Sequence, residues 1–563
     1  MGAQASYDQT PYPNLSYSQS HPDRLATVAT LLGMSPAAVE RCRVLELGCA
    51  GGGNLIPMAY GLPESQFVGI DISARQIAEG QSVVAALGLK NITFKQMDIM
   101  EIGADLGQFD YIIAHGVYSW VPPAVQDKLL FICRQNLVAN GVAYVSYNTY
   151  PGWHMIEIVR GLMLYHTRDV ADPEMRAAQA RAVLDTLAGA GLPDDSAYGS
   201  FIKMYAQFIG GKLEDARPRQ DALLLHDELE EINDPVYFHQ FVERAARYGL
   251  QYLGEAEFRT MVGSRGSVPP QAAEALGRIA RSVVEAEQYI DFVHNRTFRQ
   301  TLLCHEAVAL NRTLKPDRVA SLYAASRAQP VAATAGPPEA CSTGGPVGDP
   351  DVGSVSVVQF HGSDGVTLSI DHPASKAAIL HLAEVWPEVV PFEALLSAAR
   401  ARLATAADAD HQDAAVNNRD RQVLGANLLM AYSYSDKLME LHAYAPPVAA
   451  HVGERPVASR LARFQASHHN DRVTNLRHER VSLEEADLYL LRYLDGEHDR
   501  RTLVDLLLAG PVAEGILAVQ EDGKPVGDPD RVRQLLAEGL EKKLCWLASA
   551  GLLIDRHGRG IQA

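Results

Sequence analysis

The segment that most constrains the fold is residues 44–55, which read VLELGCAGGGNL. An apolar run of strand length ends at Glu46 and Leu47, and a glycine-rich turn follows it directly. Small residues are needed where a backbone passes close to a ligand and turns sharply into a helix. The segment therefore predicts a strand, a ligand-binding turn and a helix in succession, which is an α/β arrangement.

The same alternation of strand and helix continues over residues 43–150. The strand candidates are RVLELG, FVGID, ITFKQMD, YIIAHG and VAYVSYN. Between them, ARQIAEGQSVVAALG and QDKLLFICRQNLVANG carry apolar residues at helical spacing. Such alternation predicts a parallel sheet covered by helices on both faces, as in Rossmann-like domains.

A chain of 563 residues is too long for one hydrophobic core, and its patterns divide it into four parts. Residues 1–154 form the predicted α/β domain. Residues 155–325 lose the strand signal and contain amphipathic segments such as YFHQFVERAARYG, so we expect a helical middle domain. Residues 326–354 are rich in Pro, Gly, Ala and Ser and predict a flexible linker.

The remaining part, residues 355–563, mixes a hairpin with short helices. VSVVQFHGSDGVTLSID places an S-D-G turn between two alternating runs, which is a hairpin signal. SLEEADLYLLRYLDGEHDRRTLVDLLLAG predicts two helices joined by a glycine-containing turn. A hairpin combined with small helices predicts a C-terminal α+β region of winged-helix type.

Charge and composition exclude several classes of protein. The formal net charge of -18 disfavours binding to phosphate backbones, so no nucleic-acid partner is expected. No stretch approaches the roughly 18 consecutive apolar residues that span a bilayer, which predicts no membrane insertion. The N-terminus shows no secretory signal. The six cysteines form no C-x-x-C pair, so we expect reduced thiols, no metal site and a cytoplasmic location.

Residues at the ends of three successive strands indicate a binding site for an adenosine-containing cofactor. The turn supplies Gly48, Cys49 and Gly52, with Glu46 and Asn54 beside it. Asp71, about twenty residues on, ends the next strand and can accept both ribose hydroxyls, with Ile72 following it. Asp98 and Ile99 end the third strand and suit the adenine amino group and ring. The E-x-G-x-A-x-G spacing distinguishes this turn from the G-x-G-x-x-G of dinucleotide enzymes.

With these three strand-end motifs the chain resembles class I S-adenosylmethionine-dependent methyltransferases. More narrowly, it is similar to bacterial methyltransferases that carry a methyltransferase regulatory domain, including the rickettsial-type protein lysine methyltransferases. The matching stretches include YDQTPYPNLSYSQSHPDRLATVATLLGM, RVLELGCAGGGNLIPMA, AHGVYSWVP, YNTYPGWHM and EINDPVYFHQFVERAARYGLQYL. One departure is Ala50, where many class I enzymes have glycine.

The resemblance implies a fold class and an activity. The fold is a Rossmann-like class I methyltransferase domain, an α-helical regulatory or substrate-binding middle domain and a C-terminal winged-helix-like region. The activity is methyl transfer from S-adenosyl-L-methionine to lysine side chains of a protein substrate. In the rickettsial members the substrates are outer-membrane proteins, which this chain would meet before their export.

Methyl transfer is an in-line displacement, so the enzyme mainly aligns the reacting groups and excludes water. A lysine nucleophile must first lose its proton, which an apolar aromatic channel and a nearby acceptor favour. Residues that follow the fourth and fifth strands are the catalytic candidates: His115, Tyr118, Trp120, Tyr147 and Asn148. His115 is also a candidate for the methionine end of the cofactor, and Tyr17 and Gln19 are expected to close over it.

An acidic run in the middle domain is the candidate receptor for a cationic substrate. The predicted substrate-binding residues are Trp153, Asp227, Glu228 and Glu231. The alternative is that this run is a solvated helix face. Two other functions stay open at this stage: a small-molecule N- or O-methyltransferase, and a methyltransferase-like binding or regulatory protein. A concentration of arginines between residues 455 and 480 permits a DNA- or protein-docking module, and a homodimer is also allowed for.

Overall fold

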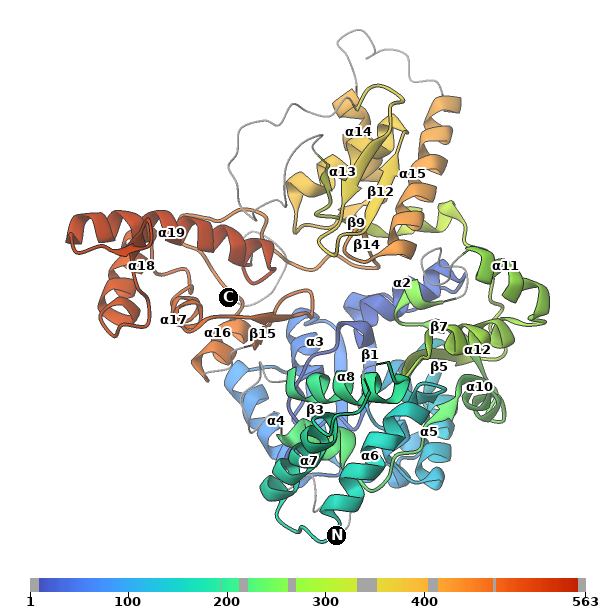
Figure 1. Cartoon of the computed structure of the whole chain (residues 1–563). Helices are drawn as coiled ribbons and strands as arrows, with labels where there is room; N and C mark the ends of the chain where they lie inside the picture. The colour runs from blue at the N-terminus through green and yellow to red at the C-terminus, as the bar shows by residue number, and fades with distance from the viewer. Residues whose placement is uncertain are drawn as a thin grey trace.

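The computed structural model describes residues 10–193, 195–211, 221–261, 270–331, 352–403, 414–468 and 472–554. Most of the predicted linker, residues 332–351, lies outside the described residues. Figure 1 shows three lobes: a lower one around the large sheet, an upper one around α13–α15, and a third formed by α16–α19.

The large sheet is the frame of the lower lobe, and it is parallel through its first five strands. Its order is β3-β2-β1-β4-β5-β8-β7, and β6 pairs with the end of β5. The chain order reverses between β1 and β4, the position where ligands bind at the carboxyl ends of open α/β sheets. The strands are β1 (Arg43–Leu47), β2 (Gln66–Asp71), β3 (Ile92–Gln96), β4 (Phe109–Ala114), β5 (Leu137–Tyr150), β6 (Val236–Tyr237), β7 (Leu250–Glu255) and β8 (Phe298–His305).

Alternating apolar residues bury both faces of this sheet, as the continuous apolar runs predict. Val44 and Tyr111 belong to one buried cluster, whereas Leu45 and Ile112 belong to another on the opposite face. The first face is covered by α2 (Pro22–Leu31), α3 (Leu55–Gly61) and α4 (Ala74–Leu87), and the second by α5 (Pro123–Gln135) and α10 (Phe238–Ala246). The predicted Rossmann-like class is confirmed.

The middle segment departs from the purely helical prediction, because β7 and β8 complete the large sheet. Both strands run antiparallel to their neighbours, β8 against β5 and β7 against β8. Their short apolar runs lie among long amphipathic segments, and periodicity alone does not separate such runs from pieces of helix. The helices of this segment are α6 (Trp153–Thr167), α7 (Pro173–Ala188), α8 (Ala197–Gly211), α10, α11 (Pro270–Ile279) and α12 (Val283–His294).

The upper lobe contains the predicted hairpin. β11 (Val358–His361) and β12 (Thr367–Ile370) pair antiparallel, and Gly365 in their turn has φ +81°. β10 (Gln329–Pro330) pairs with β11, so the chain is ordered here within the predicted linker. The other elements are β9 (Tyr323–Ala325), β13 (Val390–Pro391), β14 (Glu440–His442), α13 (Pro373–Val385), α14 (Phe392–Leu403) and α15 (Ala414–Tyr434).

The third lobe holds the two predicted consecutive helices, α17 (Glu485–Arg492) and α18 (Arg500–Leu507). A hairpin of β15 (Arg472–Thr474) and β16 (Arg480–Ser482) precedes them. The remaining elements are α16 (Arg460–Ser467), β17 (Gln520–Glu521), β18 (Lys524–Pro525) and α19 (Pro529–Ser549). Within the described ranges, every helix is too short or too polar to cross a bilayer.

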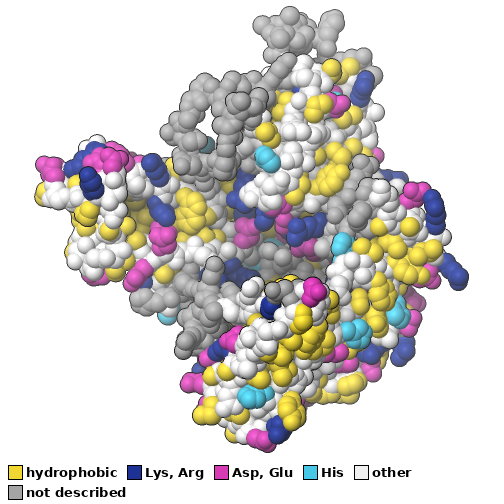
Figure 2. All heavy atoms as spheres, viewed as in Figure 1, with side chains coloured by type: hydrophobic (Ala, Val, Ile, Leu, Met, Phe, Trp, Pro, Cys, Tyr) yellow, Lys and Arg dark blue, Asp and Glu magenta, His cyan; other side chains and the backbone are white. Residues whose placement is uncertain are grey.

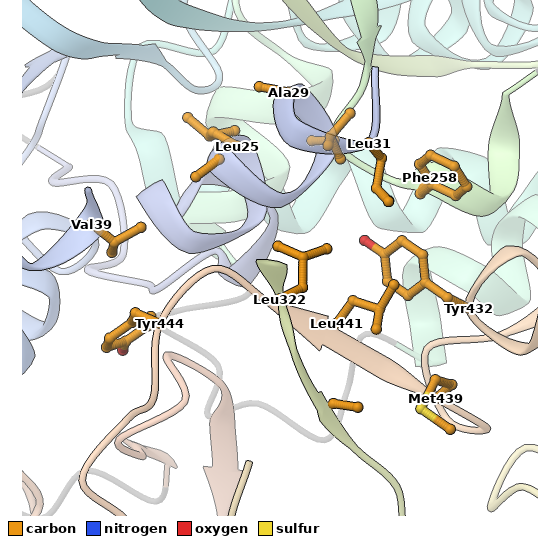
Figure 3. Close-up of a cluster of buried hydrophobic side chains, with 14 of the residues drawn as sticks. Leu25, Ala29, Leu31, Val39, Phe258, Leu322, Tyr432, Met439, Leu441 and Tyr444 are labelled. Atoms are coloured by element: carbon orange, nitrogen blue, oxygen red, sulfur yellow. The ribbon is translucent and has the colours of Figure 1, made fainter. Parts of the chain in front are cut away.

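Helix α2 joins the lower lobe to the upper one through buried apolar side chains. Leu25 and Leu31 of α2 lie in the same cluster as Leu322 and Leu441, which come from the β9–β14 region (Figure 3). Tyr432 of α15 packs against Phe258, with ring centroids 5.1 Å apart. Because this contact is a continuous apolar core, the lower and upper lobes share one hydrophobic interior.

A buried arginine ties the middle segment to the large sheet. Arg299 of β8 pairs with Glu255 of β7 at 2.5 Å and with Asp291 and Glu287 of α12 at 2.8 and 3.1 Å. All four side chains are 0–2% exposed. Removing one member of such a group leaves buried charge without its partner, which is far more costly than losing a surface ion pair.

Replacement of Arg299 by methionine is therefore expected to lower the free energy of unfolding by about 3–5 kcal/mol. The matched control is Arg278→Ala, which removes an exposed pair with Glu274 and is expected to cost under about 0.5 kcal/mol. Urea titration followed by circular dichroism measures both. Equal, small losses for the two variants would show that the buried group does not hold β7, β8 and α12 together.

Candidate active site

A cavity of about 670 Å³ opens at the carboxyl ends of β1, β2, β3 and β4, where the chain order reverses. Its wall combines the glycine-rich turn, the N-terminal segment and parts of the middle segment. The residues predicted from sequence that line it are Tyr17, Glu46, Gly48, Cys49, Asn54, Asp71, Ile72, Asp98, Ile99, His115, Trp120, Asn148, Trp153, Asp227 and Glu228.

The glycine-rich turn has a backbone that larger residues would obstruct. Gly48 and Gly52 have φ values of +72° and +80°, in the left-handed region that favours glycine. A Cβ on Gly52 would lie 2.3 Å from the Phe94 ring, and one on Gly53 would lie 2.4 Å from the backbone of Asn14. Gly52 therefore serves packing and does not line the cavity, whereas Gly53 admits the N-terminal segment above the turn.

Two strand-end carboxylates stand where the sequence predicts them. Asp71 accepts hydrogen bonds from the backbone N–H groups of Ala50 and Ser73, at 2.8 and 2.9 Å, so it also shapes the turn. Asp98 caps the short helix that begins at Ile99, and its carboxylate accepts from Met100 N–H at 2.9 Å. Both carboxylates line the cavity beside apolar Ile72 and Ile99.

Glu46 and Asn54 form a buried polar pair at the turn. Asn54 donates to Glu46 Oε1 at 2.7 Å, and the two side chains are only 4% and 3% exposed. Glu46 Oε2 has no hydrogen-bond partner among the described residues. Burial raises the pKa of Glu46 to about 8, although the hydrogen bond from Asn54 acts in the opposite direction. Glu46 therefore offers a receptor for a cationic group of a ligand.

His115 is held between aromatic side chains at the end of β4. Its ring stacks on Tyr17 with centroids 3.6 Å apart, and its Nδ1 lies 2.8 Å from the Tyr144 hydroxyl. Burial lowers the pKa of His115 to about 3, so the imidazole is neutral near pH 7. Burial also raises the pKa of Tyr17 to about 12. The neutral, stacked rings of Tyr17 and His115 give this part of the cavity a flat aromatic wall.

The far end of the cavity is aromatic and acidic. Trp120 and Trp153 meet edge to face, with ring centroids 6.3 Å apart. Glu228 is 4% exposed and accepts a hydrogen bond from the Tyr205 hydroxyl at 2.8 Å. Asp227 and Glu228 lie on a π-helical turn, η7 (Leu224–Glu228), a feature that is frequent at functional sites. The acidic run is thus partly a cavity wall and not only a solvated helix face.

Besides Gly52, four predicted residues do not reach the cavity. Tyr118 packs edge to face on Phe241, and Tyr147 stacks on the same ring, so both belong to the core between the sheet and α10. Glu231 is exposed and lies outside the cavity. Gln19 lines a separate polar cavity of about 390 Å³ between the lobes, where Figure 2 shows side chains of both charges.

Several cavity residues were not predicted from the sequence. His226 binds the Thr10 carbonyl at 2.6 Å, and Gln76 donates to the Tyr12 carbonyl at 3.2 Å, which fastens the N-terminal segment over the turn. The three consecutive glycines at residues 51–53 indicate that another part of the backbone lies close by, but the sequence does not identify that part. The unpredicted lining residues with chemistry-bearing or aromatic side chains are Tyr12, Asn14, Gln76, Tyr205, Phe208, His226 and Phe298.

In the described part of the chain, no three His, Cys, Asp or Glu side chains converge to hold an ion. Three of the arginines that permitted a DNA- or protein-docking module make internal contacts. Arg477 pairs with Glu440, Arg460 donates to the Ala86 carbonyl at 3.2 Å, and Arg480 lies 5.9 Å from the Tyr17 ring centre.

Three family models match successive parts of the chain. They are a methyltransferase domain over residues 38–151, a predicted methyltransferase regulatory domain over residues 220–305, and the PKMT C-terminal winged helix domain over residues 454–552. The order agrees with the glycine-rich turn, the acidic π-helical turn and the α16–α19 lobe described above.

One relative covers most of the chain. The uncharacterised protein RP789 of Rickettsia prowazekii is 34% identical over 534 residues, which is 94% of this chain and 90% of that protein. The chain belongs to this family of S-adenosylmethionine-dependent methyltransferases. Another Rickettsia prowazekii protein, RP028, is 36% identical over 44% of this chain and 96% of its own length.

A solved structure shares the full arrangement of this methyltransferase. PKMT2 from Rickettsia typhi superposes with a TM-score of 0.81 at 28% identity, covering 97% of this chain and all of that one, and it was also solved with AdoHcy. The cofactor of the methyltransferase is S-adenosylmethionine. Its own cavity fits that group, because the turn leaves no room for side chains and Glu46 presents an unpartnered buried oxygen.

Ala50 stands in the turn of this methyltransferase where many class I enzymes have glycine. Its φ is +49°. A left-handed conformation costs a residue with a Cβ about 1 kcal/mol, so Ala50→Gly is expected to raise the free energy of unfolding by about that amount. The control Ala78→Gly, on the exposed face of α4, is expected to lower it by about 1 kcal/mol. Urea denaturation of both variants tests the opposite signs, and destabilisation by both would contradict strain at Ala50.

Proposed function

We propose that the protein is a protein-lysine N-methyltransferase. The observation that carries the proposal is the joining of two chemically different halves in one cavity. The first half is the glycine-rich turn with Glu46 and Asp71. The second is the aromatic and acidic end with Trp153, Tyr205 and Glu228, which suits a long apolar stem that ends in a cationic amine. The PKMT name of the matching winged-helix model supports the same substrate class.

The cofactor assignments follow from the lining residues. Asp71 would receive the ribose hydroxyls, Asp98 and Ile99 the adenine, and Glu46 the α-ammonium of the methionine end, with Gly48, Cys49 and Asn54 beside it. His115 and Tyr17 would lie along the methionine end. When bound, the cofactor supplies a methyl group on a sulfonium. The sulfur departs as a neutral thioether and needs no further activation as a leaving group.

The side chains at the acidic end would prepare the amine. Trp120 and Trp153 would exclude water around the lysine stem, and desolvation favours the neutral amine. Glu228, held by Tyr205, would receive the ammonium and accept its proton, while Asp227 would add a second negative charge to the cavity wall. Asn148 would orient the amine, because its side chain is fixed by Asn233 at 2.9 Å.

The protein substrate we favour is an outer-membrane protein that is methylated in the cytoplasm before export. This rests on the resemblance to the rickettsial enzymes, and buried free thiols at Cys42, Cys49, Cys133 and Cys304 suit a reducing compartment. The homodimer stays a prediction, as do the domain boundaries at residues 154 and 325.

The cofactor assignment predicts that the affinity for S-adenosylhomocysteine depends on pH through the protonation of Glu46. Its pKa of about 8 means that the carboxyl must lose a proton to pair with the α-ammonium, so affinity for S-adenosylhomocysteine should rise between about pH 6 and pH 8. Glu46→Gln should bind more weakly at pH 8 and lose this rise. Isothermal titration calorimetry across the pH range measures both, and an identical slope in the variant would contradict the assignment.

The substrate assignment predicts a difference between two neighbouring glutamates. Glu228→Gln should lower kcat/KM for methyl transfer to a lysine-rich synthetic peptide by roughly 100-fold, since a charge-assisted hydrogen bond and a proton acceptor are lost. Its affinity for S-adenosylhomocysteine should stay unchanged. Glu231→Gln is the matched control, because Glu231 is exposed and outside the cavity. Equal activity of the two variants would refute Glu228 as the amine receptor.

A further inference from the structure

The β15–β16 hairpin of the winged-helix domain reaches the glycine-rich turn of the catalytic domain. His478 lies in the hairpin turn, and its side chain is buried, with an exposed fraction of 3%. Its Nε2 lies 2.8 Å from Asn54 Oδ1. These two residues are 424 positions apart in the sequence. The contact therefore exists only because the third lobe docks on the lower lobe.

The Asn54 side chain has its full set of hydrogen bonds, and each one is made with a different residue. Its Nδ2 group donates to Glu46 Oε1 at 2.7 Å and to Ser20 Oγ at 2.9 Å. Its Oδ1 accepts from the Tyr17 N–H at 2.9 Å and from His478. An amide has two hydrogens to donate and two lone pairs to accept with, so this set fixes which way the amide faces.

The His478 imidazole is built to donate. Burial lowers the pKa of His478 well below its ordinary value, so the ring is neutral and carries one hydrogen. Its Nδ1 has no partner in the part of the chain that the structure describes, whereas Nε2 faces the Asn54 oxygen. The bond therefore has Nε2–H as donor and the amide oxygen as acceptor.

The backbone at His478 is strained and held in place. Its φ is +62°, a left-handed conformation that is uncommon for residues other than glycine. Asn475 supports it, because its backbone carbonyl accepts from His478 N–H at 3.1 Å and its side chain accepts from the N–H groups of Arg477 and Glu479 at 2.9 and 2.8 Å. Strain that is retained in this way points to a functional contact.

We propose that His478 is a positioning residue of the cofactor site, through which the winged-helix domain fixes Asn54 and thereby the Glu46 carboxylate. His478 does not line the cavity itself. The chain of contacts runs from His478 to Asn54 and from Asn54 to Glu46, whose second oxygen faces the methionine end. The inference thus rests on the proposed placement of that end at Glu46. By linkage, cofactor binding also stabilises the docking of the hairpin.

The test compares two ligands that differ at the methionine end. S-adenosylhomocysteine carries the α-ammonium, whereas methylthioadenosine keeps the adenosine and lacks the amino-acid part. For His478→Ala, calorimetry should show a Kd for S-adenosylhomocysteine that is raised about tenfold, with the Kd for methylthioadenosine unchanged. His478→Gln, which keeps a donor, should recover most of the loss. His468→Ala, at an exposed histidine of the same lobe, is the control and should change neither Kd.

Three results would overturn the proposal. One is an unchanged Kd for S-adenosylhomocysteine in His478→Ala, and another is an equal loss for both ligands, which a general structural role produces. The third is additivity of His478→Ala and Asn54→Ala, because a shared chain of contacts requires that the second substitution add little. Glu46→Gln separates this from a failure of the cofactor placement, since that placement requires weaker binding of S-adenosylhomocysteine and an unchanged Kd for methylthioadenosine.

Discussion

The hydrogen bonds of one amide side chain join the parts of the molecule on which the active site depends. An open α/β sheet presents its glycine-rich turn at an edge and cannot enclose a ligand alone. Here the N-terminal segment and the winged-helix hairpin converge on Asn54 at the start of α3, and both bond its oxygen. The same amide holds Glu46 at the end of β1. Closure of the cofactor pocket is thus a property of the whole chain.

The middle segment contributes both to the sheet that frames the lower lobe and to the aromatic and acidic end of the cavity. Its strands β7 and β8 extend the catalytic sheet, and Arg299 binds them to α12 through three buried carboxylates. Its π-helical turn η7 carries Asp227 and Glu228 into the cavity. Methyl transfer needs alignment and exclusion of water more than acid–base machinery. The middle segment meets that need, because it both completes the rigid sheet and supplies part of the cavity wall.

Sequence reasoning located the parts of the site that are local in the chain. Gly48, Asp71 and Asp98 follow directly from strand ends, and the structure brings them to one cavity. It misplaced Tyr147, since successive strand residues face opposite sides of the sheet and the neighbour Asn148 faces the cavity instead. Contacts such as that between His478 and Asn54 depend on how lobes dock, which no local pattern encodes.

The most direct test of lysine methylation is transfer of a labelled methyl group. The purified protein would be incubated with methyl-labelled S-adenosylmethionine and an extract of its source cells, and the protein and small-molecule fractions would be analysed separately. The account predicts label in protein, mapped by mass spectrometry to lysine side chains, and its loss with Asp71→Ala. Label confined to small molecules, or to protein residues other than lysine, would contradict the account.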